Sequence, residues 1–185
     1  MNAILMVDDI GALGSNGHLL YDIPEDKKWF KSLTLGKVVI MGRKTFESLP
    51  VKPLPERTNV VITANREFNP EGVSVFHNIV SAMDSVGMNY LSSDVFIIGG
   101  NSIYNGLIDC CDFVYIARLH ARRYDELKVD TFFEYFDSIN TFYRADKESF
   151  RLRRSTQKRV DYYYIKDGKR LKSSAGCEFM VFQRM

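Results

Sequence analysis

Apolar residues in the first two thirds of the chain fall into short continuous runs, without the regular alternation of a strand that is buried on one face only. The runs lie at residues 3–7, 38–41, 59–63, 73–76, 95–98 and 113–119. Short continuous runs rich in Val and Ile predict strands that are covered on both faces of a sheet.

Helical patterns fill most of the stretches between these runs, at residues 24–33, 43–49, 80–86 and 102–108. The first pattern opens with Pro24, and Glu25 and Asp26 follow, as is typical of a helix N-terminus. Strands that alternate with helices predict an α/β fold, with a central, mostly parallel twisted sheet flanked by helices.

The alternation of strands and helices ends after about residue 130. Residues 150–152, 160–165 and 178–182 predict strands with no helix between them, and Asp167-Gly168 is typical of a hairpin turn. We expect these strands to add antiparallel to one edge of the sheet. The length of 185 residues fits a single domain over residues 1–185.

Composition narrows the possible partners and compartments. Lys and Arg number 25 against 23 Asp and Glu, a net charge of +2, which does not favour nucleic-acid binding by the whole domain. Cys110, Cys111 and Cys177 form no C-x-x-C pair, so neither a metal site nor a disulfide framework is expected. No apolar run approaches the roughly 20 residues that span a bilayer. We therefore expect a cytoplasmic protein without a membrane partner.

Asp26 is a candidate for proton chemistry. On the predicted helix it shares one face with Trp29, Phe30 and Leu33, at positions i, i+3, i+4 and i+7. Apolar neighbours would desolvate the carboxylate and raise its pKa, which is the property of a group that handles protons near neutral pH. From the spacing alone, a role in complementing the helix dipole is the simpler explanation.

Two strand ends carry glycines that lead directly into helices. Gly99-Gly100 follows the run at 95–98, and the sequence Gly-Arg-Lys-Thr at residues 42–45 follows the run at 38–41. Both arrangements suit a phosphate at the carboxyl edge of a parallel sheet, although a tight turn or a solvated helix start explains each of them as well. Arg66 and His77 follow other predicted strands and would reach the same edge.

Two further segments each have a functional and a structural explanation. Residues 11–21, rich in Gly, Ser and Asn, predict a loop that is either a lid over a site or ordinary surface. The basic residues between 151 and 159 precede three tyrosines at 162–164, a combination that would suit single-stranded nucleic acid. The nearly neutral chain favours instead the solvated face of an edge hairpin.

Five segments in one order carry a resemblance: YDIPEDKKWF, VVIMGRKTFESLP, PLPERTNVVIT, VFIIGGNSIY, and VYIARL with VDTFF. Together they resemble dihydrofolate reductase over residues 1 to about 133, and the final EFMVFQRM is similar to the last strand of that family. Residues 134–176 form a divergent, extended C-terminal region. The resemblance implies NADPH-dependent reduction of 7,8-dihydrofolate to 5,6,7,8-tetrahydrofolate by hydride transfer, inhibition by antifolates, and a monomeric enzyme.

The resemblance also implies a substrate site. Asp26 becomes the acid that pairs with the pterin edge and assists its protonation, and Tyr21 offers a hydrogen bond to an ordered water. Arg57 grips the α-carboxylate of the glutamate tail. The residues expected to contact substrate are Ile4, Leu5, Met6, Asp26, Phe30, Leu54, Arg57 and Ile98.

For the cofactor NADPH, the resemblance implies a longer set of contacts, with phosphates held at residues 43–45 and the 2′-phosphate at Thr63 with Arg66 or His77. The Gly99-Gly100 peptide is expected to be cis, and Asp130 is expected to contact the loop at 14–21. The cofactor-binding residues are Met6, Leu13, Gly14, Leu19, Gly42, Arg43, Lys44, Thr45, Thr63, Arg66, His77, Ile98, Gly99, Gly100, Asn101, Ser102, Ile103 and Tyr104.

Four positions depart from the family pattern. Leu20-Tyr21 stands where Pro-Trp is usual, and Lys27 would lower the pKa of Asp26 if it turned toward the pocket. Ala117 lacks the hydroxyl of the usual threonine, and Met6 is larger than the usual small residue. These changes bear on catalytic efficiency and antifolate sensitivity.

Two other functions remain open on the sequence. A related reductase of the same fold would act on another pterin or a pyrimidine, as in riboflavin synthesis, but such a substrate has no carboxylate for Arg57 to bind. A binding module would instead use the basic C-terminal extension.

Overall fold

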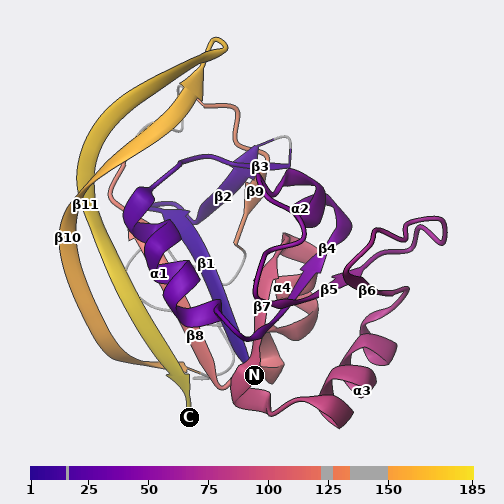
Figure 1. Ribbon diagram of the computed structural model, residues 1–185. Coiled ribbons are helices and arrows are strands. Elements are labelled where there is room, and N and C mark those ends of the chain that lie inside the picture. Colours follow the sequence, from indigo (N-terminus) through magenta and orange to yellow (C-terminus); the bar gives the residue numbers. More distant parts are fainter. Residues whose placement is uncertain (16, 122–126, 134–149) are drawn as a thin grey trace. The chain divides into compact units, whose positions relative to one another are not determined.

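The computed structural model describes residues 1–15, 17–121, 127–133 and 150–185 (Figure 1). Internal contacts divide the chain into two compact units. The first unit comprises Met1–Ile4 and Lys31–Asp112, and the second comprises Leu5–Phe30 and Phe113–Met185. Strand β1 (Asn2–Asp8) and helix α1 (Pro24–Thr34) contribute residues to both units.

The first unit contains a parallel sheet, and its strands occur where the continuous apolar runs predict them. The strands neighbour one another in the order β1, β7 (Val95–Gly99), β4 (Val38–Gly42), β5 (Thr58–Ile62) and β6 (Val73–Phe76). All four pairings are parallel. Val39, Ile40 and Ile97 are fully buried, so the central strands are covered on both faces as expected.

Helices of the first unit follow its strands. They are α2 (Arg43–Ser48), α3 (Ile79–Asn89) and α4 (Asn101–Leu107), with short 3₁₀ turns at η1 (Ser92–Asp94) and η2 (Ile108–Cys110). Helix α3 starts at Asn78, whose side chain accepts a hydrogen bond from the Ser81 amide at 2.8 Å. This cap satisfies one of the unpaired amides at the helix N-terminus.

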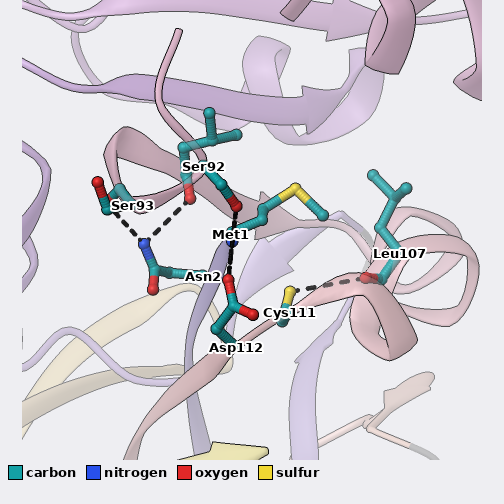
Figure 2. Close-up of polar contacts among 8 residues, drawn as sticks. Met1, Asn2, Ser92, Ser93, Leu107, Cys111 and Asp112 are labelled. Atoms are coloured by element: carbon teal, nitrogen blue, oxygen red, sulfur yellow. Dashed lines mark hydrogen bonds and ion pairs between the residues drawn. The ribbon is translucent and has the colours of Figure 1, made fainter. Parts of the chain in front are cut away.

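Polar contacts anchor the beginning of β1 (Figure 2). The Asn2 carboxamide donates to the carbonyl of Ser93 at 2.9 Å, and the Met1 amino group donates to Ser92 and Asp112. These contacts tie the first residues of the chain to the segments on either side of β7 and α4. They hold β1 in register with β7 inside the first unit.

The second unit contains an antiparallel arrangement of β8 (Phe113–Leu119), β11 (Lys169–Arg184) and β10 (Phe150–Lys166). Strands β10 and β11 form one long curved hairpin, drawn in orange and yellow in Figure 1. Asp167 and Gly168 turn the chain with φ of 51° and 72°, as the hairpin signal predicts. The α/β class, with a mostly parallel sheet and antiparallel C-terminal strands, is confirmed.

The three segments predicted as C-terminal strands, 150–152, 160–165 and 178–182, all lie in strands, but the first two belong to one strand, β10. The ladder runs from the pair Phe150↔Arg184 to the pair Lys166↔Lys169, with a shift in register between Leu152 and Arg154. The charged stretch between residues 151 and 159 belongs to β10, which is an edge strand of its sheet. Most side chains of this stretch are exposed. An exposed edge strand needs no apolar alternation, so its sequence resembles a loop.

The expectation of a loop without strands at residues 11–21 is also wrong. Strand β2 (Ala12–Ser15) pairs antiparallel with β3 (His18–Leu19) and with β9 (Thr131–Phe132). A Cβ added to Gly14 would lie 2.7 Å from the carbonyl oxygen of His18, so glycine allows this close approach. The amide of Asp130 donates to the carbonyl of Gly14 at 3.2 Å, which confirms the expected contact of Asp130 with this segment.

A buried cluster holds the second unit together. Its members are Met6, Ala12, Leu20, Tyr21, Ile23, Ala117, Leu119, Ala121, Leu127, Val160, Tyr162, Tyr164, Cys177 and Phe179. The cluster therefore joins β1, the segment before α1, β8 and both strands of the hairpin. Within the described residues, no helix is long and apolar enough to cross a bilayer, and no group of His, Cys, Asp or Glu could hold a metal ion.

Candidate active site

Asp26 lies in the first turn of α1, where Pro24 opens the helix. Desolvation raises the pKa of its carboxyl from the ordinary 3.8 to about 7, and the nearby charge of Lys27 opposes this only in part. The raised pKa expected from the apolar face of the helix is therefore confirmed. A carboxyl with this pKa exchanges its proton near neutral pH.

Aromatic side chains pack helix α1 against two strands of the second unit. Trp29, one turn beyond Asp26, packs edge-on against Phe179 at 5.1 Å and against Tyr115 at 6.0 Å between ring centroids. Phe179 lies on β11 and Tyr115 on β8, so two strands cover the same face of the helix. Trp29, one of the aromatic residues on the predicted face, thus packs on strands β8 and β11.

A buried thiol lies close to the acid. Cys177 on β11 is fully buried, and desolvation raises its pKa to about 12, with further contributions from the charges of Asp26, Glu25 and Glu178. The thiol therefore stays protonated and uncharged under all ordinary conditions. It gives Asp26 a neighbour without charge, which adds to the desolvation of the carboxyl.

Lys27, one of the departures from the family pattern, turns to a partner outside the helix. Its ammonium lies 2.6 Å from the carboxylate of Asp22, and 58% of its side chain is exposed. Its charge lowers the pKa of Asp26, as expected, but desolvation dominates. The basic neighbour does not prevent Asp26 from holding a proton near pH 7.

Tyr21 is held by an acid that the sequence reasoning missed. The Tyr21 hydroxyl donates to Asp8 at 3.4 Å, and both residues are buried. Asp8 also accepts the amides of Ile10 and Ala12 at 3.0 Å each, while its burial raises its pKa. The signal for Asp8 is its place at the end of the first apolar run, where a side chain accepts amides of the following turn.

The two predicted glycine segments meet in the first unit. A Cβ on Gly42 would lie 3.5 Å from the side chain of Ile103, and a Cβ on Gly100 would lie 3.2 Å from the Thr45 hydroxyl. The ends of β4 and β7 and the starts of α2 and α4 are therefore adjacent, with only hydrogens on the backbone at Gly42 and Gly100. The Gly99–Gly100 peptide is cis, as the resemblance predicted.

This adjacency fits the phosphates of a dinucleotide. Bare backbone and the Thr45 hydroxyl line it, and Asn101 adds a buried carboxamide oxygen that has no hydrogen-bond partner among the described residues. Lys44 is exposed beside it. The Arg43 guanidinium instead contacts Glu47 on its own helix, at 2.7 and 2.9 Å, so it would have to change partners to reach a phosphate.

Thr63 and His77 lie together at the ends of β5 and β6. The Thr63 amide donates to the carbonyl of Phe76 at 2.9 Å, and Nδ1 of His77 lies 3.0 Å from the Thr63 carbonyl oxygen. Arg66, three residues further on, is exposed. A hydroxyl, an imidazole and a guanidinium in this region suit an anionic group such as a ribose phosphate.

Asn59, which the sequence reasoning also missed, organises the segment that carries Leu54 and Arg57. Its carboxamide accepts the Leu54 amide and donates to the Leu54 carbonyl, both at 2.9 Å, and donates to the Arg57 carbonyl at 3.0 Å. Desolvation lowers the pKa of Arg57. The signal for Asn59 is a buried polar residue inside an apolar run.

Tyr104 connects α4 to the first strand within the first unit. Its hydroxyl donates to the carbonyl of Ile4 at 2.8 Å, and a Cβ on Gly99 would lie 3.2 Å from its ring. Ile98, half-buried, packs on the cluster that includes Val39 and Met41. Ile4, Gly99 and Tyr104 thus lie together.

The remaining expected site residues divide by unit and by exposure. Leu5, Met6 and Leu13 are buried and Phe30 is half-buried in the second unit, where Leu19 is 64% exposed. Ser102 is exposed in the first unit. The expected substrate contacts and the expected cofactor contacts each include residues of both units.

Comparisons with known proteins agree with this geometry. The family described as "Dihydrofolate reductase" matches residues 1–167, further along the chain than the five quoted segments, which end at about residue 133. Dihydrofolate reductase of Staphylococcus aureus (strain Mu50 / ATCC 700699) is 39% identical over 132 residues, which cover 71% of this chain and 76% of that protein. The Bacillus subtilis (strain 168) enzyme is 29% identical over 173 residues, covering 94% and 96%.

A solved structure is similar along nearly the whole chain. Dihydrofolate reductase from Enterococcus faecalis, complexed with NADP(H) and RAB-propyl, is 27% identical with a TM-score of 0.72. The match covers 99% of this chain and 95% of that one. The resemblance stated from the sequence motifs is confirmed.

Changing Asp26 to Asn is expected to stabilise the free protein in a pH-dependent way. The pKa of Asp26 is about 7 in the folded protein and 3.8 in an ordinary aspartate. Between pH 3.8 and pH 7 the folded protein therefore binds more protons than the unfolded chain, and its stability falls as the pH rises. Asn carries no charge and avoids that loss. In urea unfolding, the free energy of unfolding of Asp26→Asn should exceed that of wild type. The difference should be smallest near pH 4 and reach about 1–3 kcal/mol near pH 8.

The matched control is Asp84→Asn, which changes an exposed acid on α3 in the same way. The free energy of unfolding of that variant, relative to wild type, should not increase between about pH 4 and pH 8. A stability difference for Asp26→Asn that stays constant from about pH 4 to pH 8 would contradict the raised pKa.

Proposed function

We propose how this chain, which belongs to the dihydrofolate reductase family, carries out the NADPH-dependent reduction of 7,8-dihydrofolate to 5,6,7,8-tetrahydrofolate. The observation that carries the proposal is the desolvated carboxyl of Asp26, whose pKa of about 7 suits it to hold a proton for the substrate. Other residues would bind the two flat ring systems.

NADPH, when bound, supplies the hydride for the reduction. The adjacency of Gly42, Thr45 and Gly100 supports phosphate binding there, because backbone without side chains and a hydroxyl can approach a phosphate closely. Thr63, with His77 or Arg66, would bind the 2′-phosphate that distinguishes NADPH from NADH.

Asp26 would pair with the amino and amide edge of the pterin. Near neutral pH its carboxyl is protonated in a large fraction of molecules, so it can favour protonation of the ring nitrogen, directly or through one water. Tyr21, held by Asp8, would order that water. Ala117 is fully buried and offers no hydroxyl to this network, so solvent would fill the place of the usual threonine.

Arg57 would bind the α-carboxylate of the glutamate tail, and Phe30 and Leu54 would pack on the aminobenzoate ring. The three hydrogen bonds of Asn59 support this assignment, because they fix the segment between Leu54 and Arg57. Antifolates that reproduce the pterin edge and the tail would occupy the same residues.

The enzyme would act as a monomer in the cytoplasm. All three cysteines are free thiols, which fits a reducing compartment. Each unit has its own buried core, and the proposed contacts require no residue from a second copy.

The first test is turnover of dihydrofolate by Asp26→Asn. Loss of the acid should lower kcat/KM on the order of 100-fold near pH 7, and the deficit should shrink as the pH falls toward about 5, because solvent then protonates the substrate. Wild-type kcat/KM should decline above about pH 7. NADPH affinity, followed by quenching of protein fluorescence, should not change.

Full turnover by the Asp26→Asn variant would remove Asp26 from the mechanism while leaving the reaction itself in place. A complete absence of dihydrofolate-dependent turnover in the wild-type protein, with NADPH still bound, would point to a different pterin or pyrimidine substrate.

The second test separates folate from substrates without a glutamate tail. Arg57→Ala should raise KM for dihydrofolate by roughly 30- to 100-fold, because a charge-assisted bidentate hydrogen bond is lost, and should leave kcat largely intact. The same variant should reduce dihydropteroate, which lacks the glutamate, as well as wild type does. Equal KM for dihydrofolate in wild type and variant would favour a riboflavin-type reductase.

A further inference from the structure

The C-terminal hairpin continues beyond the strand on which it packs. Strand β8 pairs with β11 only between Cys177↔Leu119 and Gln183↔Phe113, whereas β10 and β11 pair with each other as far as Lys166↔Lys169. We call residues 160–175 the distal hairpin. This segment lies within the divergent C-terminal region that the catalytic assignments above do not use.

The distal hairpin is bonded to the backbone just before α1. Asp22 and Tyr163 exchange two hydrogen bonds, in which each amide donates to the other residue's carbonyl at 2.8 Å. Asp22 stands two residues before Pro24, where the helix begins, and four residues before Asp26. The start of the helix that carries the acid is therefore attached to the hairpin.

Side chains reinforce this attachment on its exposed side. The Arg170 guanidinium donates to the Asp22 carboxylate at 2.9 Å and lies 4.1 Å from the centroid of the Tyr163 ring. A planar guanidinium can satisfy both contacts at once, which a lysine ammonium does less well. The same Asp22 carboxylate accepts Lys27 at 2.6 Å, so one carboxylate joins the hairpin to the first turn of the helix.

The opposite side of the attachment is apolar. Tyr162 packs edge-on against Tyr21 at 5.5 Å between ring centroids, and both are 2% exposed. Ile23 and Tyr164 belong to the same buried cluster. Successive residues of β10 therefore contact the segment from Leu20 to Ile23 on two faces. The rings of Tyr162 and Tyr164 pack on its buried face, and Tyr163 with Arg170 contacts its exposed face.

The groups around Asp26 come from the two elements that this attachment connects. Glu25 and Lys27 flank it on α1, and Cys177 acts on it from β11, the strand that also carries Arg170. A shift of Asp22 would move Lys27 and the first helical turn together. The acid would then change its distance from both the buried thiol and the substrate.

We propose that Arg170 is a positioning residue for Asp26, acting through its contact with Asp22 and Tyr163. By holding Asp22, it fixes the start of α1 and the direction of Lys27, and so keeps the acid in the place where it assists protonation of the substrate. This inference rests on the role of Asp26 given under the proposed function.

The test compares Arg170→Ala with wild type in dihydrofolate turnover from about pH 5.5 to pH 8. At the acid end, where solvent protonates the substrate, the two should agree within about twofold. At the alkaline end, kcat/KM of the variant should be roughly three- to tenfold lower, because a misplaced acid delivers its proton poorly. Arg170→Lys should recover part of the loss, and NADPH affinity should be unchanged.

Control variants separate position from charge and from folding. Arg154→Ala and Lys169→Ala each remove an exposed cation of the same hairpin for which no ion pair is found among the described residues. Both should follow the wild-type pH profile. Asp22→Asn keeps the size of the side chain but weakens its hold on Arg170 and Lys27, and it should reproduce the alkaline loss even if Arg170→Ala folds poorly.

The Asp26→Asn background shows whether Arg170 acts through the acid. In that background, Arg170→Ala should cause no further loss of turnover. A loss that is equal at every pH, or that multiplies the loss of Asp26→Asn, would mean a merely structural role and overturn the inference. Full turnover by Asp26→Asn alone would instead overturn the proposed role of the acid, on which this inference depends.

Discussion

Desolvation of one carboxyl is the constraint that organises the second unit. Burial raises the pKa of Asp26 to about 7. Above that pH the buried carboxyl is ionised, and its charge reduces the stability of the folded chain. The packing of Trp29 on Phe179 and the uncharged thiol of Cys177 maintain the dry environment. The unit therefore keeps an acid where ionisation is unfavourable, and this is the property that the proposed role of Asp26 requires.

Under the proposed function, the first unit brings backbone close to the phosphates of the cofactor. Adjacent parallel strands β4 and β7 end in glycines, and Gly42 and Gly100 leave room beside Thr45 and Ile103. Asn59 positions the backbone of Arg57 by donating a hydrogen bond to its carbonyl. In each case a residue without catalytic chemistry determines where a binding group lies.

Sequence patterns predicted the parallel strands and their helices because full burial leaves continuous apolar runs, as at Val39 and Ile97. The aromatic face of the first helix predicted the raised pKa of Asp26, and the family resemblance predicted the cis peptide at Gly99–Gly100. The edge hairpin that the sequence patterns favoured for the charged residues 151–159 is confirmed, but the short strands around Gly14 were missed, because their exposed backbone pairs without an apolar pattern. Asp8 and Asn59 were missed because most of their hydrogen-bond partners are backbone groups, and the sequence marks them only as polar residues at the end of one apolar run and inside another.

The pKa of Asp26 in the free protein tests the account most directly. Carbon-13 NMR of aspartate-labelled protein, with the Asp26 signal assigned by its absence in Asp26→Asn, would follow the carboxyl through its titration. The account predicts a midpoint at about 7. A midpoint near the ordinary value of 3.8 would show that the carboxyl is solvated, and it would contradict both the origin of the acid's function and the positioning role inferred for Arg170.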